Sequence, residues 1–233
     1  MHLSVIVPTL NRIDTAQLIA ARIFSLFADV QVEVIVVVPT AQPVPASSER
    51  LRFVADAGRG VYRAFTAGLK QARGQYIWFL GDDDYPLDAA STLQGLILAG
   101  RSDLLVAPVL FSSGRIYRPT RSRLILQFLN WCQQGVIYRR ELLLRHRFYR
   151  RLPVQADQYV NIQLRCDGGV SIRFWDTPIC MFGVNGVSGR IQDLGYRALR
   201  RALAYRTLGC AQFLAFRLLL WVEPLVKKLV NIR

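Results

Sequence analysis

Histidine is nearly missing from this chain of 233 residues, which contains only His2 and His146. A Ser-His-Asp arrangement or a histidine-rich metal site needs histidines placed beside their chemical partners. Two isolated histidines argue against both kinds of site. The four cysteines also lie far apart, and no two of them form a Cys-x-x-Cys pair. We therefore expect reduced and mostly buried thiols in a cytosolic protein.

Long uncharged hydrophobic runs are missing too. A membrane-spanning helix needs roughly 20 consecutive apolar residues, and the nearest approach, Thr207 to Val222, is interrupted by Arg217. The chain opens on a strand-like run, Leu3 to Val7, without the basic region of a secretion signal. We therefore predict neither a signal peptide nor a membrane span.

Acidic residues are few. The chain has 16 Asp and Glu but 30 Lys and Arg, which gives a net charge of +14. Nearly all the cations are arginines, whose planar guanidinium matches phosphate geometry well. This balance favours an acidic partner, namely a nucleotide, an anionic lipid or a nucleic acid. An arginine excess that reflects only genome base composition is the alternative. The hydrophobic fraction of 52% is ample for a packed core.

Short apolar runs alternate with helical patterns in the first half of the chain. Strands are expected at 3–7, 32–38, 51–54, 76–80 and 104–107, and helices at 15–27, 62–73 and 88–99. This alternation predicts an α/β fold, Rossmann-like, with a mostly parallel central sheet and flanking helices. Ligands bind at the carboxyl ends of such strands, so we expect the loops after Val7, Val38, Val54 and Leu80 to share one rim.

Two later regions are strongly basic. Residues 115–151 hold ten arginines against one acid, Glu141, which indicates either a second lobe facing an anionic acceptor or a solvated basic face. Residues 198–221 have an apolar helical pattern, and Arg206, Arg217 and Lys228 recur every eleven residues, about three turns apart. The predicted basic stripe suits an amphipathic helix in the membrane interface. A helix packed on the core or on a partner subunit is the alternative.

Three adjacent carboxylates, Asp82, Asp83 and Asp84, directly follow the expected strand at 76–80. They repel one another unless they are solvated or neutralised by a cation. A hard divalent ion held by one or two carboxylates and by substrate phosphates is a common arrangement, and it would neutralise a leaving diphosphate. The alternative is an acidic turn before the next helix.

A separate carboxylate, Asp157, opens a helical pattern at residues 155–165. A displacement by an attacking hydroxyl needs a base that takes the proton of that hydroxyl. Asp157 is our candidate for that base. The alternative is an acid that merely favours the helix dipole.

Four segments resemble family 2 of the glycosyltransferases, in its branch for bacterial surface polysaccharides of the colanic acid, O-antigen and capsule type. They are the opening at 4–12, the segment Asp56–Tyr62 with Ala64 and Gly68, the strand and acids at 76–84, and the block at 134–142 with Ala156-Asp157. Gly186–Ser188 resembles a late loop of the same family. Departures are Pro39 and Thr40, Gly58, Arg63 and Gln133-Gln134, each where the family usually has an acid or a histidine.

The resemblance implies a GT-A fold and an inverting transfer of sugar from a nucleotide-sugar to an acceptor hydroxyl, with a divalent cofactor, Mg²⁺ or Mn²⁺. It implies residues 1–114 as the nucleotide-sugar half, 115–189 as the acceptor half and 190–233 as the basic helical tail. Asp157 would be the base, and Asp82 and Asp84 the metal ligands. The donor would be bound by Pro8, Thr9, Asn11, Arg12, Asp56, Gly58, Arg59, Gly60, Asp82 and Asp83.

The resemblance and the tail together imply a lipid-linked saccharide acceptor and a cytoplasmic protein, peripheral on the inner membrane of a bacterium. Two alternatives stay open, a non-catalytic component of a membrane complex and a basic nucleic-acid-binding protein. We expect no nucleic-acid partner, because no known nucleic-acid motif is present and the acids at 82–84 would oppose it. A homo-oligomer stays open.

Overall fold

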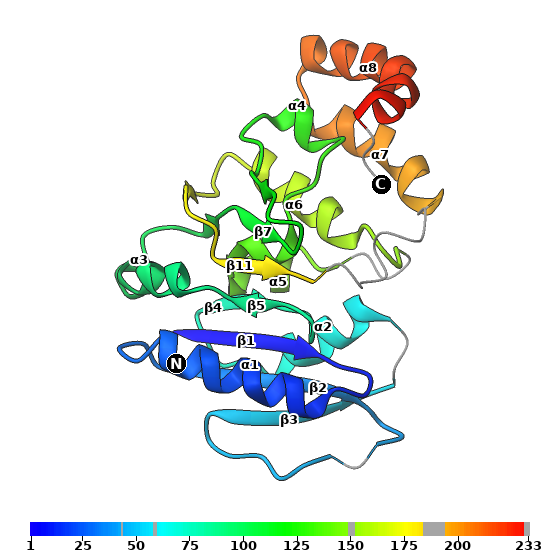
Figure 1. Cartoon of the computed structure of the whole chain (residues 1–233). Coiled ribbons are helices and arrows are strands. Elements are labelled where there is room, and N and C mark those ends of the chain that lie inside the picture. Colours follow the sequence, from blue (N-terminus) through cyan, green and yellow to red (C-terminus); the bar gives the residue numbers. More distant parts are fainter. Residues whose placement is uncertain (43, 58–59, 149–151, 184–193, 231–233) are drawn as a thin grey trace.

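The computed structural model describes residues 1–42, 44–57, 60–148, 152–183 and 194–230 (Figure 1). The first half of the chain alternates strands and helices. Its elements are β1 (Leu3–Pro8), α1 (Ile13–Leu26), β2 (Val32–Pro39), β3 (Leu51–Asp56), α2 (Val61–Gln71), β4 (Tyr76–Phe79), β5 (Tyr85–Pro86), the 3₁₀ helix η1 (Asp88–Leu93), α3 (Gln94–Ala99) and β6 (Leu104–Val106).

The second half has shorter strands and more helix. Its elements are β7 (Val109–Phe111), β8 (Ile116–Tyr117), α4 (Arg123–Leu126), the 3₁₀ helix η2 (Gln133–Gly135), β9 (Val136–Arg139), α5 (Arg140–Arg145), α6 (Ala156–Cys166), β10 (Ile172–Phe174), β11 (Cys180–Phe182), α7 (Leu194–Thr207) and α8 (Cys210–Val230).

Seven strands form the central sheet, in the order β10-β6-β9-β4-β1-β2-β3. All neighbours are parallel except β9, which runs antiparallel to both β4 and β6. A smaller sheet has the order β5-β11-β7-β8. The predicted α/β fold with a mostly parallel sheet is therefore confirmed.

The central sheet is covered on both faces, which is why its strands read as continuous apolar runs. Successive side chains of a strand point to opposite faces, so Val5 and Val7 of β1 join the core cluster under α1 and α3. Ile6, between them, joins the cluster under α2, α6 and α7. This double burial fixes the register of β1, and with it the loop that starts at Pro8.

Two helix predictions needed correction. The helix expected at 15–27 begins at Ile13, and its N-cap residue is Arg12. The helix expected at 88–99 begins as the 3₁₀ helix η1 and becomes α-helical only at Gln94.

The tail differs most from expectation, because the single helix predicted across 198–221 is two helices. The chain turns at Leu208 and Gly209, between α7 and α8. α7 packs on α6 and buries Tyr196, Leu203 and Ala204. Arg206 and Arg217 therefore lie on different helices, and the predicted stripe with Lys228 does not form on one helix.

Both tail helices lie at one end of the molecule, far from β2 and β3 (Figure 1). Within the described ranges, none of the helices combines the length and the apolar character needed to cross a bilayer.

Candidate active site

The loops after β1 and β4 meet at the carboxyl rim of the central sheet, as predicted. The Thr9 hydroxyl donates to Oδ2 of Asp82 over 2.6 Å and accepts the backbone N–H of Arg12 at 2.9 Å. The Arg12 guanidinium lies 3.9 Å from Oδ1 of Asp82. One buried hydroxyl thus joins the two loops and holds the Asp82 carboxylate toward the rim. Pro8 ends β1 half-buried beside them, and Asn11 is exposed.

The three consecutive carboxylates have unequal surroundings. Asp84 is 3% exposed and accepts the backbone N–H of Gly81 at 2.5 Å and that of Gly183 at 3.0 Å. Burial raises the pKa of Asp84 to about 6, and the two amides offset part of that effect while Asp83 adds to it. Asp82 and Asp83 are only half-buried. Asp84 is therefore the fixed, desolvated member of the cluster.

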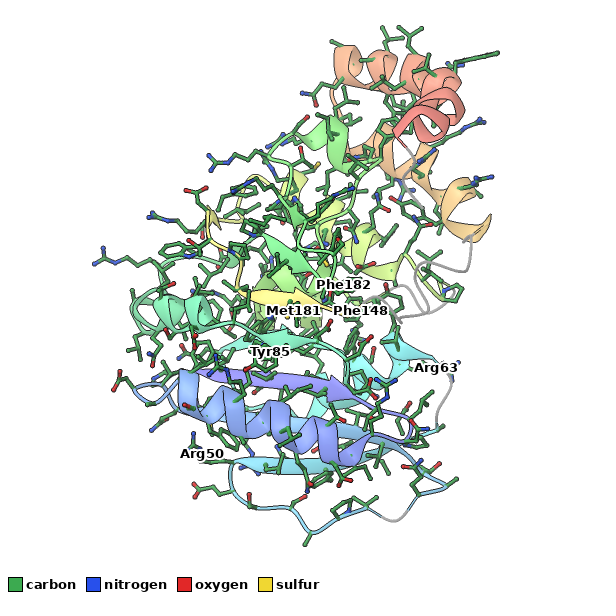
Figure 2. All side chains as sticks on the ribbon, viewed as in Figure 1. Arg50, Arg63, Tyr85, Phe148, Met181 and Phe182 are labelled. Carbon is green, nitrogen blue, oxygen red and sulfur yellow. The ribbon has the colours of Figure 1, made fainter. Side chains whose placement is uncertain are left out.

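Gly183 approaches this cluster from the end of β11. A Cβ atom on Gly183 would lie 2.4 Å from Cγ of Asp83 and 2.5 Å from its backbone oxygen, so only glycine fits the present backbone. The antiparallel pairing of Met181 with Tyr85 brings β11 alongside β5 and the acidic loop (Figure 2). Sequence reasoning missed Gly183, because its partner Asp84 is 99 residues away.

Asp157 lies in the first turn of α6 and is 8% exposed. Its Oδ1 accepts the Tyr62 hydroxyl at 2.7 Å and the backbone N–H of Gln158 at 2.8 Å. Its Oδ2 accepts the side-chain amide of Asn130 at 2.7 Å. Burial raises the pKa of Asp157, and these donors offset part of the rise. Since a carboxylate oxygen has two lone pairs, Oδ2 can accept one more donor.

The Cys132 thiol connects the surroundings of the two buried carboxylates. Burial raises its pKa, and the negative charges of Asp84 and Asp157 both raise it further. The thiol donates to Oε1 of Gln134 at 3.1 Å, and the Gln134 side chain also hydrogen-bonds Asp84. The predicted metal ligand and the predicted base are thus both near enough to Cys132 to act on its thiol.

Asp56 and Gly60 lie at the end of β3 and the start of α2. The backbone oxygen of Asp56 accepts the N–H of Thr40 at 2.7 Å, which joins the loops after β2 and β3. Gly60 has φ +102°, which glycine adopts without strain. Gly58, Arg59 and Gly186–Ser188, which the sequence analysis named, lie outside the described residues.

A pocket of about 470 Å³ begins at Asp56 and Gly60 and follows α2. Arg63, Thr66 and Lys70 of α2 line one side, and Phe148, Leu152 and Pro153 line the other. Figure 2 shows Arg63 and Phe148 on these two sides. Tyr62 also lines this pocket, and its hydroxyl reaches Asp157, so the pocket adjoins the predicted base.

The acids at 82–84 offer carboxylate oxygens to the divalent cation that the sequence predicts. Carboxylate oxygens are the ligands that Mg²⁺ and Mn²⁺ favour. Among the described residues, no three His, Cys, Asp or Glu side chains gather into a metal site. This fits an ion that takes one or two protein carboxylates and fills its remaining positions with substrate phosphates and water.

The fold is similar to that of several solved glycosyltransferases. The Staphylococcus aureus TarS 1–349 structure with UDP-GlcNAc superimposes with a TM-score of 0.62 at 19% identity, covering 88% of this chain and 66% of that one. A mannosyltransferase from Pyrobaculum calidifontis, with GDP-Man and Mn²⁺, gives 0.55 at 18% identity, covering 93% of this chain and 64% of that one. Glucosyl-3-phosphoglycerate synthase from Mycobacterium tuberculosis, with Mg²⁺ and UDP, gives 0.50 at 20% identity, covering 88% and 79%.

Another TarS structure is covered over only 39% of its length, so this chain corresponds to a part of that protein. No curated protein sequence matches the chain.

These likenesses define the class of the fold, a GT-A glycosyltransferase domain. The family model for glycosyl transferase family 2 matches residues 4–160, which is more than half of the chain. The chain belongs to glycosyl transferase family 2. The surface-polysaccharide branch stays a prediction.

Proposed function

We propose that this chain transfers a sugar from a nucleoside diphosphate-sugar to an acceptor hydroxyl with inversion at the anomeric carbon. One observation carries the proposal: the rim that holds Thr9, Arg12 and Asp82 also carries the buried carboxylate of Asp84, and Asp84 and the buried Asp157 both act on the thiol of Cys132. The site therefore offers neighbouring positions for an anionic donor and for the base that would act on the acceptor.

The loops after β1 and β3 would hold the nucleoside. Pro8, Thr9, Asn11 and Arg12 come from the first loop, and Asp56, Arg59 and Gly60 come from the second. Arg12 lies 3.9 Å from Asp82 and its side chain is 48% exposed. An exposed ion pair of this length contributes little, so the guanidinium is free to turn toward a diphosphate, which it can bind through two nitrogens.

Asp82 and Asp84 would hold the Mg²⁺ or Mn²⁺ ion, and Asp82 and Asp83 would also face the donor. When bound, such an ion neutralises negative charge on the departing diphosphate. Asp84 is held by the amides of Gly81 and Gly183, so its position is fixed before any ligand arrives.

Asp157 would act on the acceptor. Its Oδ2 takes the proton of the acceptor hydroxyl as that oxygen forms a bond to the anomeric carbon, while the bond from this carbon to the diphosphate oxygen breaks. Attack from the face opposite the leaving group inverts the anomeric carbon. The raised pKa of Asp157 makes it a stronger base than an exposed aspartate.

We further propose a lipid-linked saccharide as the acceptor, of the kind used in bacterial envelope polysaccharide synthesis, and a location on the cytoplasmic face of the inner membrane. α8 packs Phe213, Phe216 and Leu220 against α4 and α7. Its opposite face exposes Leu214 (62%), Leu218 (71%) and Trp221 (84%). An apolar helix face this exposed is typical of a lipid contact.

The two tail helices also carry exposed cations. Arg201 and Arg206 of α7 and Arg217 of α8 are all exposed. Basic residues beside an apolar helix face are attracted to anionic lipid headgroups. The net charge of +14 would thereby serve to bind the anionic donor and the membrane. The acids at the rim disfavour a nucleic-acid partner.

The test uses the full chain with UDP-GlcNAc and GDP-mannose as probes, with and without Mn²⁺, and measures release of the nucleoside diphosphate. We expect Mn²⁺-dependent release from a nucleotide-sugar and a loss of at least about 100-fold in Asp84→Ala. A non-catalytic role in a membrane complex would instead give binding without release. Equal release by wild type and Asp84→Ala would contradict the proposal.

A further inference from the structure

Behind Asp157 lies a chain of polar side chains that the transfer chemistry does not use. We propose that Gln133, Tyr138, Asn161 and Asn130 form a hydrogen-bonded relay that positions Asp157 through the amide of Asn130. The inference rests on the proposed role of Asp157 as the base. In the described structure the side chains of Gln133, Tyr138 and Asn161 make no hydrogen bond to the Asp157 carboxylate, so they would act as positioning residues.

The direction of the relay follows from its contacts. An ionised carboxylate only accepts hydrogen bonds, so the Asn130 group 2.7 Å from Oδ2 of Asp157 must be the NH₂. The Asn130 oxygen then accepts the NH₂ of Asn161 at 3.0 Å. The Asn161 oxygen in turn accepts the Tyr138 hydroxyl at 2.8 Å. Each amide has its orientation set by the next group away from Asp157.

Gln133 completes the relay at its far end. Its Oε1 lies 3.3 Å from the Tyr138 hydroxyl oxygen, but that hydroxyl has one proton, which goes to Asn161. Its Nε2 is buried and has no partner among the described residues. A half-turn of the Gln133 amide lets the NH₂ donate to the Tyr138 oxygen and places the amide oxygen, instead of a proton donor, in the position without a partner. Every donor in the relay would then point toward Asp157.

Because the relay is buried, reversing the direction of any one of its hydrogen bonds costs free energy. Tyr138 and Asn161 are fully buried, and Gln133 is 7% exposed. Turning one amide alone would place two donors or two acceptors face to face, away from water, and an unsatisfied buried polar group costs about 1–3 kcal/mol. The relay therefore keeps an NH₂ group aimed at the carboxylate before any substrate arrives.

The 3₁₀ helix η2, which contains Gln133, also contributes a contact to Asp84. Gln134 follows Gln133 in η2, and its side chain hydrogen-bonds Asp84. Its backbone oxygen accepts the indole N–H of Trp78 at 2.8 Å, which ties η2 to β4. One turn of backbone thus supports Asp84 through one glutamine and Asp157 through the other.

The titratable groups that face Asp157 come from three elements. They are Tyr62 of α2, Tyr138 of β9, and Cys132, which precedes η2. Burial raises the pKa of each of them, so all three are neutral near pH 7. The groups that most favour the ionised form of Asp157 are hydrogen-bond donors, namely Tyr62, Gln158 and Asn130. Its ionised form therefore depends on hydrogen-bond donors, which the relay supplies.

The test follows the Asp157 carboxyl group itself. The full chain is labelled with ¹³C at the aspartate side-chain carboxyl, and the Asp157 resonance is assigned by its loss in Asp157→Asn. We expect Tyr138→Phe to raise the titration midpoint of Asp157 by about 0.5–1 pH unit, and Asn130→Ala to raise it by about one unit or more, because donors to the ionised form are weakened or lost. Tyr76→Phe is the matched control, since Tyr76 is also fully buried but donates to the Ser102 oxygen at 2.6 Å.

An unchanged midpoint in folded Tyr138→Phe would overturn the relay. If Tyr138→Phe does not fold, Gln133→Leu tests the far end, and it should raise the midpoint in the same direction by a smaller amount; no rise there overturns the relay equally. In the pH profile of donor turnover, the acid limb should shift in the same direction as the titration midpoint of Asp157, while the KM for the donor stays constant. Failure of the proposed function would give another result. If Asp157 is not the base, Asp157→Asn would keep full turnover, whether or not the Asp157 resonance shifts in the relay variants.

Discussion

The hydroxyl of Tyr62 lies 2.7 Å from Oδ1 of Asp157, although 95 residues separate them in the chain. The backbone oxygen of Val154 is also within hydrogen-bond reach, so the two acceptors share the one proton of this hydroxyl. Tyr62 belongs to the first turn of α2, beside the end of β3, and Asp157 to the first turn of α6. Tyr62, in the part of the chain predicted to bind the nucleotide-sugar, therefore holds the proposed base, which lies in the part predicted to bind the acceptor.

This contact predicts a specific pH dependence. Asp157 acts only when ionised, and burial raises its pKa above the ordinary 3.8, so turnover should rise with pH through that raised pKa and then level off. Tyr62→Phe removes a donor to the ionised form, so the pKa should rise further and the acid limb should move to higher pH by about one unit. The measurement is kcat/KM for donor turnover between pH 4 and 8. Tyr205→Phe, at a tyrosine that is 71% exposed, should leave the profile unchanged, and an unmoved limb in Tyr62→Phe would count against Asp157 as the base.

Thr9 predicts a loss of donor affinity. Thr9→Val keeps the shape of the side chain but removes the hydroxyl that joins Asp82 to the backbone of Arg12. A lost hydrogen bond to a charged group is worth about 1.5–3 kcal/mol, so binding of UDP or GDP with Mn²⁺ should weaken about 10- to 100-fold by calorimetry. Thr92→Val is the control, because the Thr92 hydroxyl donates only to the Ala89 backbone oxygen of η1. Equal affinities in the two variants would show that this rim does not bind the nucleotide.

Gly183 predicts a steric effect on the acidic cluster. In Gly183→Ala the new methyl group would meet Cγ of Asp83 at 2.4 Å, so the backbone must shift and Asp84 loses an amide donor. We expect the gain in melting temperature on adding Mn²⁺ and nucleoside diphosphate to shrink to less than half of the wild-type gain. Gly95→Ala is the matched control, since a Cβ there has no atom within 4 Å. An undiminished gain in Gly183→Ala would place the cation and diphosphate elsewhere.

The exposed face of α8 predicts membrane binding that depends on single side chains. Leu218→Glu places a carboxylate where Leu218 is 71% exposed, so the fold should be preserved while flotation with anionic lipid vesicles drops several-fold. Leu98→Glu makes the same change at a leucine of α3 that is 48% exposed and should float like wild type. Removing residues 198–233 is a poorer test, because α7 buries Leu203 and Ala204 in the fold. Vesicle binding that is insensitive to Leu218→Glu would exclude this face as the contact.

Sequence patterns were sufficient for the core of the fold. β1 and β2 are runs of β-branched residues followed by proline, and this local signal agrees with their burial on both faces of the sheet. The tail was predicted less well. Gly209 allows the chain to turn there, but the returning helix α8 also packs Phe216 against Phe128, which follows α4, at a ring-centroid distance of 5.3 Å. No local pattern encodes that contact.

The sequence by itself determined the alternation of strands and helices, the acids at 82–84 at the end of β4, and the family to which the chain belongs, because each depends on neighbouring residues or on a local motif. Only the tertiary structure decided which acid is desolvated, which glycine lies against the cluster and which side chains surround Asp157. Burial and hydrogen bonding of a carboxylate depend on groups such as Gly183 and Tyr62, which reach it from 99 and 95 residues away. That proximity arises from packing, and packing is a property of the folded chain.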